Sequence, residues 1–180
     1  MSSEAWLTVL VLAVALERVA ELVVSNRNAA WAFARGGVET GRGHYPVMVL
    51  LHTGLLVGIL AEVWLLRPAF VPALGWTMLA LVVASQALRW WCITTLGPRW
   101  NTRVIVVPGL PLVTGGPYRF FSHPNYVAVV VEGVALPLVH SAWITATVFT
   151  LANAALLTVR IRTENSALTG AAPSADGALR

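Results

Sequence analysis

Long apolar stretches separated by short polar segments dominate this chain. No Asp, Glu, Lys or Arg occurs from Pro68 to Leu88, or from Gly133 to Val159. A helix that crosses the hydrocarbon core of a bilayer needs about 20 mostly apolar residues. The pattern therefore predicts an all-α integral membrane protein with about five transmembrane helices. The expected spans cover residues 5–24, 47–66, 71–93, 126–139 and 142–168.

The last two expected spans are close together in the sequence. Only His140 and Ser141 separate them, which predicts a tight hairpin. The fourth span would be about 21 Å long at 1.5 Å per residue, short of the roughly 30 Å hydrocarbon core, so we expect it to be incomplete and buried. Before it lies a polar segment, 97–125, whose many Gly and Pro residues exclude a single helix. Within this segment, residues 103–107 and 110–113 are expected to be extended.

Composition supports the membrane assignment. Hydrophobic residues make up 57% of the chain and charged residues 11%, against roughly 45–50% and about 25% in soluble domains. All twelve basic residues are arginine. They concentrate in 25–46, 97–125 and the C-terminal tail, which five spans would place on one side of the membrane. The opposite side of the membrane would hold only Arg67. The positive-inside rule then places the long loops and the C-terminus in the cytoplasm, and it accounts for the net charge of +4 without a nucleic-acid partner.

The chain is expected to form one domain. Residues 1–168 are expected to form a single membrane-embedded unit, followed by a disordered tail at 169–180. The first residues lack the basic region of a secretory signal, so we expect the first span to be retained. One cysteine, Cys92, excludes an internal disulfide and a cysteine-based zinc site, and no metal-ligand cluster is visible. The use of arginine alone suggests a GC-rich bacterial genome and hence a bacterial cytoplasmic membrane.

One polar cluster precedes the fourth span, in the segment from Gly116 to Tyr126. Pro124 suits the first turn of a helix and holds His123 extended. His123 then stands beside the free N–H groups of a helix N-terminus, where an anionic group such as a cofactor carboxylate can bind. The alternative is that His123 and Asn125 only cap the helix.

Two further clusters lie on expected spans. Arg160 and Glu164 are four residues apart and share a helix face; they are either a site or interfacial charges at a helix end. Glu17, Glu21 and Asn28 form one polar stripe on the first span, beside Arg18. Ionisable groups within a span normally face the bundle interior or a water-filled site, so this stripe is either functional or an ion pair that joins helices.

From Gly116-Pro117-Tyr118 through His123-Pro124-Asn125-Tyr126 to Arg160-x-x-x-Glu164, the chain resembles the isoprenylcysteine carboxyl methyltransferase family of membrane enzymes. The resemblance covers about residues 86–168, the expected cofactor-binding half. It implies S-adenosylmethionine as cofactor, in a cytoplasm-facing pocket roofed by residues 97–125. Family cofactor or active-site positions match His123, Tyr126, Arg160 and Glu164, with Tyr118 and Asn125 as further candidates for cofactor binding. Two positions depart from the family pattern, Ser122 and Asn165.

The N-terminal half is similar to a bacterial branch of that family, some of whose members O-methylate alkylpyrones or phenolic lipids. This resemblance covers about residues 17–52. The residues that match include Glu17, Arg18, Glu21, Asn28, Gly37, Glu39, Gly41, His44 and His52. It implies a lipophilic acceptor that reaches the site from the bilayer, with Glu17, Glu21, Asn28 and His44 as candidates for substrate binding.

The resemblance also implies roles within the pocket. Glu164 would hold the cofactor's amine or ribose hydroxyls, and Arg160 the acceptor oxygen or the cofactor's carboxylate; both are the expected catalytic residues. A phenol or enol acceptor would benefit from a base, either Glu164 or His123. Two other functions remain open at this point. One is an NADPH-dependent reductase of the sterol-reductase-like group, and the other is a non-catalytic transporter or scaffold.

Overall fold

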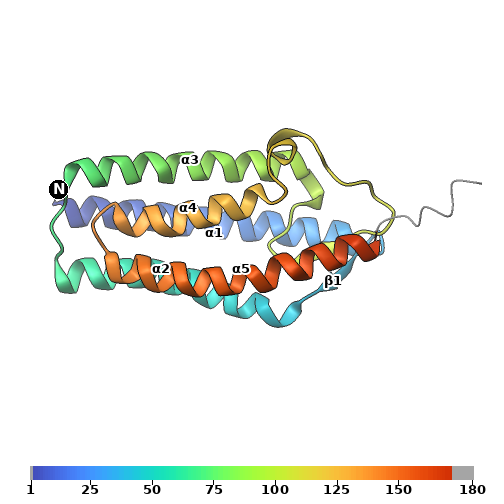
Figure 1. Cartoon of the computed structure of the whole chain (residues 1–180), viewed down its shortest axis with the longest axis horizontal. Coiled ribbons are helices and arrows are strands. Elements are labelled where there is room, and N and C mark those ends of the chain that lie inside the picture. Colours follow the sequence, from blue (N-terminus) through green and yellow to red (C-terminus); the bar gives the residue numbers. More distant parts are fainter. Residues whose placement is uncertain (1, 172–180) are drawn as a thin grey trace, which may run out of the picture.

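The computed structural model describes residues 2–171 as a bundle of five helices that lie along one axis (Figure 1). The helices are α1 (Ser3–Phe33), α2 (Tyr45–Leu66), α3 (Pro72–Leu96), α4 (Pro124–Leu138) and α5 (Trp143–Ala171). Two short strands, β1 (Val38–Thr40) and β2 (Val104–Val106), and three 3₁₀ turns, η1 (Arg42–His44), η2 (Gly97–Arg99) and η3 (Gly116–Arg119), lie between them. Each expected helix is present, with ends shifted by a few residues except for α1, which continues to Phe33.

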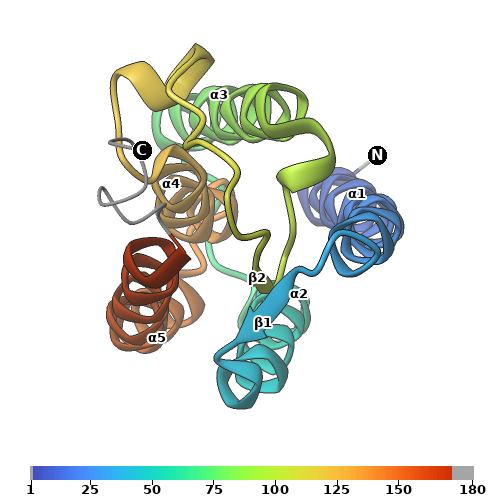
Figure 2. The same ribbon diagram turned by 90° about the vertical axis from the view of Figure 1, so that its right-hand side faces the viewer.

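Successive helices run in opposite directions, so their connections gather at the two ends of the bundle (Figure 1). The short connections, 67–71 and 139–142, lie with the N-terminus at what we call the short-loop end. The connections 34–44 and 97–123 lie at the opposite, long-loop end. Figure 2 looks onto that end and shows the segment with β2 lying between α1 and α4. The long-loop end therefore contains most of the polar backbone that is not helical.

Local sequence explains where several helices begin and end. Pro72 and Pro124 stand in the first turns of α3 and α4, where a missing N–H costs nothing. Arg67, with φ of 47°, ends α2 in the left-handed region. Gly97, with φ of 54°, ends α3, a backbone conformation that glycine adopts without strain.

The apolar core lies toward the short-loop end. It joins Leu7 and Val11 of α1, Ile59 and Val63 of α2, and Leu136 of α4, all almost fully buried. Glu62 closes this end: its carboxylate accepts hydrogen bonds from the backbone N–H groups of Ile144 and Thr145 at 3.0 and 2.7 Å. The carboxylate thus caps the start of α5, although it belongs to another helix.

Within the described residues, three helical segments are long and apolar enough to cross a membrane: Arg42–Leu66, Pro72–Arg99 and Trp143–Gly170. The outer faces carry many exposed large apolar side chains, as expected for a surface that meets lipid. Exposed aromatic side chains lie near both ends. Trp64, Trp76 and Trp143 lie near the short-loop end, and Trp91, Phe120 and Phe121 near the long-loop end. Tryptophan and tyrosine concentrate at membrane–water interfaces, so the exposed tryptophans fit a membrane protein.

Some expectations need correction. The expected extended piece at 103–107 contains β2, which pairs antiparallel with β1, with Glu39 opposite Ile105, whereas residues 110–113 belong to no strand. A strand at 38–40 was not expected, because three residues give too short a pattern to recognise. Residues 169–171 continue α5 and are not a disordered tail; the rest of that predicted tail, 172–180, lies outside the described residues.

Candidate functional site

A cleft of about 440 Å³ opens at the long-loop end, between the start of α4, the C-terminal part of α5 and the segment after α3. Such a volume lies in the range of small-molecule sites, about 300–1,000 Å³. One wall is apolar and is formed by Val104, Ile105, Val106, Val107, Leu110, Leu112 and Val113. The other wall is polar and is formed by Tyr118, His123, Asn125, Tyr126, Arg160, Glu164 and Asn165. Every residue predicted to be catalytic or cofactor-binding therefore lines one cleft.

The apolar wall is held in place by α1. The side-chain amide of Asn28 donates to the carbonyl oxygens of Gly97 and Trp100 at 3.1 and 2.7 Å. Three residues earlier on α1, the Ser25 hydroxyl lies 2.8 Å from both the Asn101 side-chain oxygen and the Thr102 hydroxyl. These bonds give the Trp100 carbonyl a partner and tie the segment that follows α3 to α1.

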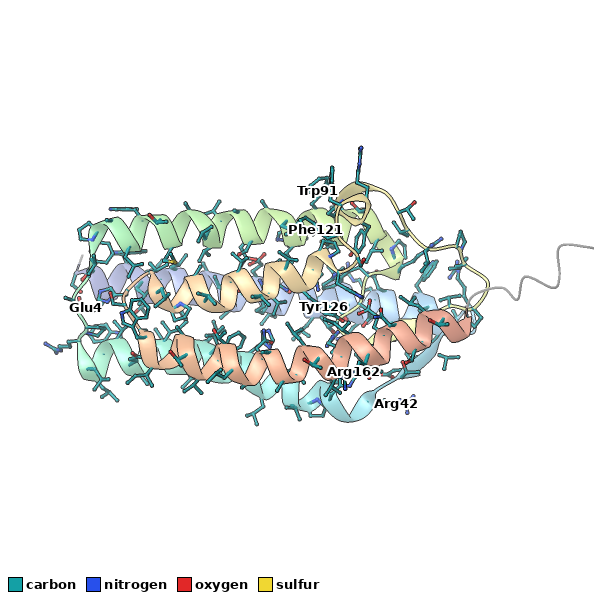
Figure 3. All side chains as sticks on the ribbon, in the orientation of Figure 1. Glu4, Arg42, Trp91, Phe121, Tyr126 and Arg162 are labelled. Atoms are coloured by element: carbon teal, nitrogen blue, oxygen red, sulfur yellow. The ribbon has the colours of Figure 1, made fainter. Side chains whose placement is uncertain are left out.

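The polar wall is organised around the Tyr126 hydroxyl. Tyr126 projects from the first turn of α4 at the long-loop end (Figure 3). Its hydroxyl donates a hydrogen bond to the Glu164 carboxylate and accepts one, at 3.1 Å, from Nε of Arg160. Arg160 and Glu164 share one face of α5, as their spacing predicts, and Tyr126 connects them across the helix interface.

Arg160 is a buried cation, with 6% of its surface exposed. Its guanidinium donates to neutral acceptors, which are the Tyr126 hydroxyl, the backbone carbonyl of Thr102 and the sulfur of Met48. No carboxylate forms an ion pair with it within residues 2–171. A buried charge is costly unless an opposite charge accompanies it. Arg160 is thus a guanidinium in the cleft wall that a bound anion would stabilise.

His123 occupies the N-cap position of α4, but only its backbone takes part in the cap. Its side chain makes no capping hydrogen bond. Instead its Nε2 lies 3.1 Å from the Asn165 side-chain oxygen, and its ring stacks on that of Tyr126 at 5.4 Å between centroids. Glu164 approaches the other ring nitrogen at 3.9 Å. The capping alternative is therefore wrong for His123, which joins the polar wall.

Two buried polar atoms in the cleft wall have no partner in the described structure. They are the Asn125 side-chain oxygen and Nε1 of Trp100. Buried polar groups are normally hydrogen-bonded, so a polar ligand that reached these two atoms would be stabilised by them. Nearby, burial raises the pKa of the Tyr118 phenol above its ordinary value, which keeps it a neutral hydroxyl.

Tyr118 is positioned by a glycine with a special conformation. Gly116 has a φ of 55°, and a Cβ there would lie 2.5 Å from the Thr95 hydroxyl. Only glycine fits without a shift, because both the backbone and the space exclude a side chain. The turn η3 can therefore lie directly against α3.

The four residues predicted to bind substrate lie elsewhere. None of Glu17, Glu21, Asn28 and His44 lines the cleft. Glu17 accepts a hydrogen bond at 2.6 Å from the Trp90 indole, Asn28 holds the segment after α3, and His44 packs against Gly41. Their contacts are those of structural residues, and their role in substrate binding stays a prediction.

Glu21 belongs to a buried group of charges that we call the central charge cluster, made of Arg18, Glu21, Arg89 and Glu132. Arg18 pairs with Glu21 at 2.8 Å, and Arg89 pairs with Glu132 at 2.7 Å. Longer contacts of 3.3 and 3.5 Å cross between the two pairs. Arg18 also contacts the neighbouring Glu17 at 3.3 Å. The cluster joins α1, α3 and α4, and every charge in it has a partner of opposite sign. The alternative that the stripe on α1 joins helices is correct for Arg18 and Glu21.

Sequence reasoning did not select several cleft residues. Arg99, Asn101 and Arg103 line the cleft from the segment after α3. This segment has no periodicity that assigns inward and outward faces, so no signal in the sequence separated them from other loop residues.

Comparison with known proteins extends this picture. The family model described as isoprenylcysteine carboxyl methyltransferase (ICMT) family matches residues 78–170. The chain belongs to this family. The matched range contains the whole polar wall of the cleft and excludes α1 and α2. It makes the protein a member of a family of membrane methyltransferases and favours methyl transfer over the reductase and scaffold alternatives.

Two bacterial relatives match nearly the whole chain. The "Uncharacterized protein YpbQ" of Bacillus subtilis is 39% identical over 164 residues, which are 91% of this chain and 95% of that protein. An "Uncharacterized protein" of Haemophilus influenzae is 23% identical over 154 residues, 84% of this chain and 88% of that one. No solved structure matches the chain. The similarity to these relatives therefore includes the N-terminal half that the family model does not cover.

Proposed function

We propose that this member of the isoprenylcysteine carboxyl methyltransferase family is an S-adenosylmethionine-dependent O-methyltransferase that acts on a lipophilic acceptor from the bilayer. The observation that carries the proposal is Arg160, a buried guanidinium without a carboxylate partner in the described structure, joined through the Tyr126 hydroxyl to Glu164. The apolar wall lies in the same cleft. An anion site next to a carboxylate and an apolar surface suits a reaction between a polar cofactor and a lipid.

The residues of the cleft fit the proposed cofactor. S-adenosylmethionine, when bound, supplies a methyl group on a cationic sulfonium, together with an amine, a carboxylate and ribose hydroxyls. Glu164 and Asn165 provide acceptors for the amine and hydroxyls, and His123 and Tyr118 add polar contacts. The unpartnered oxygen of Asn125 and the indole N–H of Trp100 match further donors and acceptors. The volume of about 440 Å³ is in the range for such a ligand.

We propose that Arg160 and Glu164 act on the acceptor. A phenol or enol hydroxyl gives its proton to a carboxylate oxygen of Glu164, which serves as general base. The guanidinium of Arg160 then stabilises the negative oxygen left behind, because it is buried and lacks another anion. Tyr126 holds the two side chains at a fixed separation, so the acceptor oxygen is positioned before reaction.

The favoured acceptor is an alkylpyrone or phenolic lipid with a free hydroxyl, rather than an isoprenylcysteine carboxylate. Two bacterial relatives that span most of the chain support a bacterial protein, for which prenylated C-terminal cysteines are not the expected substrates. Asn165 also changes the rim of the cleft, since the family pattern has a second glutamate there. The alkyl tail would stay in the membrane while the polar ring reaches the cleft.

We further propose that the bundle lies in the bacterial cytoplasmic membrane with the long-loop end in the cytoplasm. Arginine is abundant at that end, and the positive-inside rule favours this orientation. Five spans require α1 and α4 to accompany the three long apolar segments. Inside the bundle, Arg18 and Glu21 of α1 pair with each other and also contact Glu132 of α4 and Arg89 of α3, which makes the insertion of α1 tolerable.

A binding and transfer experiment tests the proposal. Purified protein is titrated calorimetrically with S-adenosylhomocysteine, and methyl transfer from labelled cofactor is measured with an alkylpyrone and with N-acetyl farnesylcysteine. We expect binding that Glu164→Ala weakens strongly, and transfer to the alkylpyrone. Binding of a reduced nicotinamide in place of S-adenosylhomocysteine would overturn the proposal. Transfer to farnesylcysteine alone would overturn only the choice of acceptor.

A further inference from the structure

A second groove of about 560 Å³ lies at the long-loop end, between the end of α1, β1 and the start of α2. Its lining residues are Asn26, Phe33, Glu39, Arg42, Tyr45, Pro46 and Arg103. Arg103 also lines the cofactor cleft, so it stands between the two. The other lining residues precede the range that the family model matches.

The groove carries an excess of positive charge. The Glu39 carboxylate, which is almost buried, lies 3.3 Å from Nε of Arg42 and 3.4 Å from Nη1 of Arg103. Two guanidinium groups therefore share one carboxylate. The side chain of Arg42 is 76% exposed, and its contact with Glu39 uses only Nε. Its terminal N–H groups remain available to an anion.

Apolar surface continues from this charged groove along the bundle. Phe33 lines the groove and is 42% exposed, and Val47 and Leu50 on the first turns of α2 are 54% and 73% exposed. Arg42 lies at the α2 side of the long-loop end in Figure 3, at the start of a segment long and apolar enough to span a membrane. A charged groove thus lies next to an apolar surface that faces lipid. The groove matches the headgroup of a phospholipid, and the apolar surface matches its acyl chains.

We propose that this groove binds the phosphate of an anionic membrane phospholipid, with Arg42 and Arg103 as its cationic contacts and the acyl chains along Val47 and Leu50. Arginine pairs well with phosphate because its planar fork donates two parallel hydrogen bonds. Basic pockets between transmembrane helices are suited to anionic headgroups. Glu39 competes with the phosphate for both arginines. The proposal does not rest on methyl transfer, since no cofactor takes part in it.

The competition between Glu39 and phosphate yields opposite predictions for two variants. The protein in detergent is offered phosphatidylglycerol or phosphatidylcholine with the same chains, and bound lipid is counted by native mass spectrometry. We expect selective retention of phosphatidylglycerol, weakened about fivefold by Arg42→Gln, the factor for one arginine near an anionic surface. Glu39→Gln should strengthen retention, because it frees both arginines. Arg35→Gln is the matched control, since Arg35 lies over Trp31 at the same end and outside the groove.

Other outcomes contradict the proposal. Equal retention by the unmodified protein and Arg42→Gln would show that the groove does not select the phosphate. Loss of lipid in both Arg42→Gln and Glu39→Gln would show damage to the fold instead of charge competition. Inorganic phosphate serves as a third probe: if it displaces phosphatidylglycerol completely at equal concentration, the ligand is a soluble anion and the lipid part of the proposal is wrong.

Discussion

The central charge cluster and the charged side chains of the cleft differ in how their charges are balanced. In the central charge cluster, Arg18 and Arg89 face Glu21 and Glu132, so that every charge has a partner from the protein. In the cleft, Arg160 contacts a phenol and a backbone carbonyl but no carboxylate within the described residues. Arg89 in the first group and Arg160 in the second are buried, and both groups come from helices that are mostly apolar.

The difference distinguishes charged residues that stabilise the fold from charged residues that bind a ligand. A buried ion pair that loses one partner leaves an uncompensated charge, whereas a buried cation without a partner already carries that cost in the folded protein. Such a cost is tolerated where a ligand compensates it. The central charge cluster should therefore matter for stability and the cleft for binding, and the two groups should respond in opposite ways to substitution.

The largest expected effect on stability is in the central charge cluster. Arg89→Met leaves Glu132 without its 2.7 Å partner and should lower the free energy of unfolding by about 3–5 kcal/mol. The measurement is reversible unfolding in detergent micelles, followed by tryptophan fluorescence. The double variant Arg89→Met/Glu132→Met should recover most of this loss, because no unpaired charge remains. A double variant as unstable as the single one would contradict the explanation.

In the cleft, substitution should reduce activity and spare the fold. Arg160→Gln removes the buried cation, and we expect methyl transfer to fall about 100-fold, as when one donor to a developing oxyanion is lost. The free energy of unfolding should stay the same or rise. Arg162→Gln is the matched control, because Arg162 lies on the same helix but is exposed and outside the cleft. Equal losses of activity in the two variants would show that Arg160 has no special role.

A smaller effect is expected at the short-loop end, where Glu62 caps α5. Glu62→Leu removes the acceptor for two backbone N–H groups and should cost about 1–2 kcal/mol, as for other helix caps. Affinity for S-adenosylhomocysteine should not change, because the cap lies at the end of α5 opposite the cleft. Amide hydrogen exchange should increase in the first turn of α5. Weakened cofactor binding would show that the two ends are coupled.

The smallest effect is expected for Asn28, which holds the apolar wall from outside the cleft. Asn28→Ala should lower stability by about 1 kcal/mol, the usual contribution of a hydrogen bond. Amide exchange at residues 97–101 should rise, and cofactor affinity should fall severalfold. Arg27→Ala is the control, because Arg27 lies on the same helix but is exposed and lines neither the cleft nor the second groove. If the variant raises only the KM for the acceptor and leaves exchange unchanged, Asn28 touches substrate as the sequence predicts.

Much of the fold follows from local pattern. The charge-free runs located α3 and α5, and Pro124 indicated where α4 begins, because these signals depend only on neighbouring residues. The pairing of β1 with β2 was missed, since strands so short have no readable periodicity. The cleft residues His123, Tyr126, Arg160 and Glu164 were selected mainly by resemblance to a family. The spacing of these residues alone did not distinguish a functional role from a structural one.

The sequence by itself determined that the chain forms apolar helices, that Glu17, Glu21 and Asn28 share a face of α1, and that Arg160 and Glu164 share a face of α5. Only the tertiary structure decided what those faces meet. Glu21 meets Arg89 in a closed cluster, Asn28 meets backbone carbonyls, and Arg160 meets Tyr126 in an open cleft. A buried polar group needs a partner, but helix periodicity gives only its direction from the axis. The identity of that partner depends on how the helices pack, across as many as 114 residues of sequence.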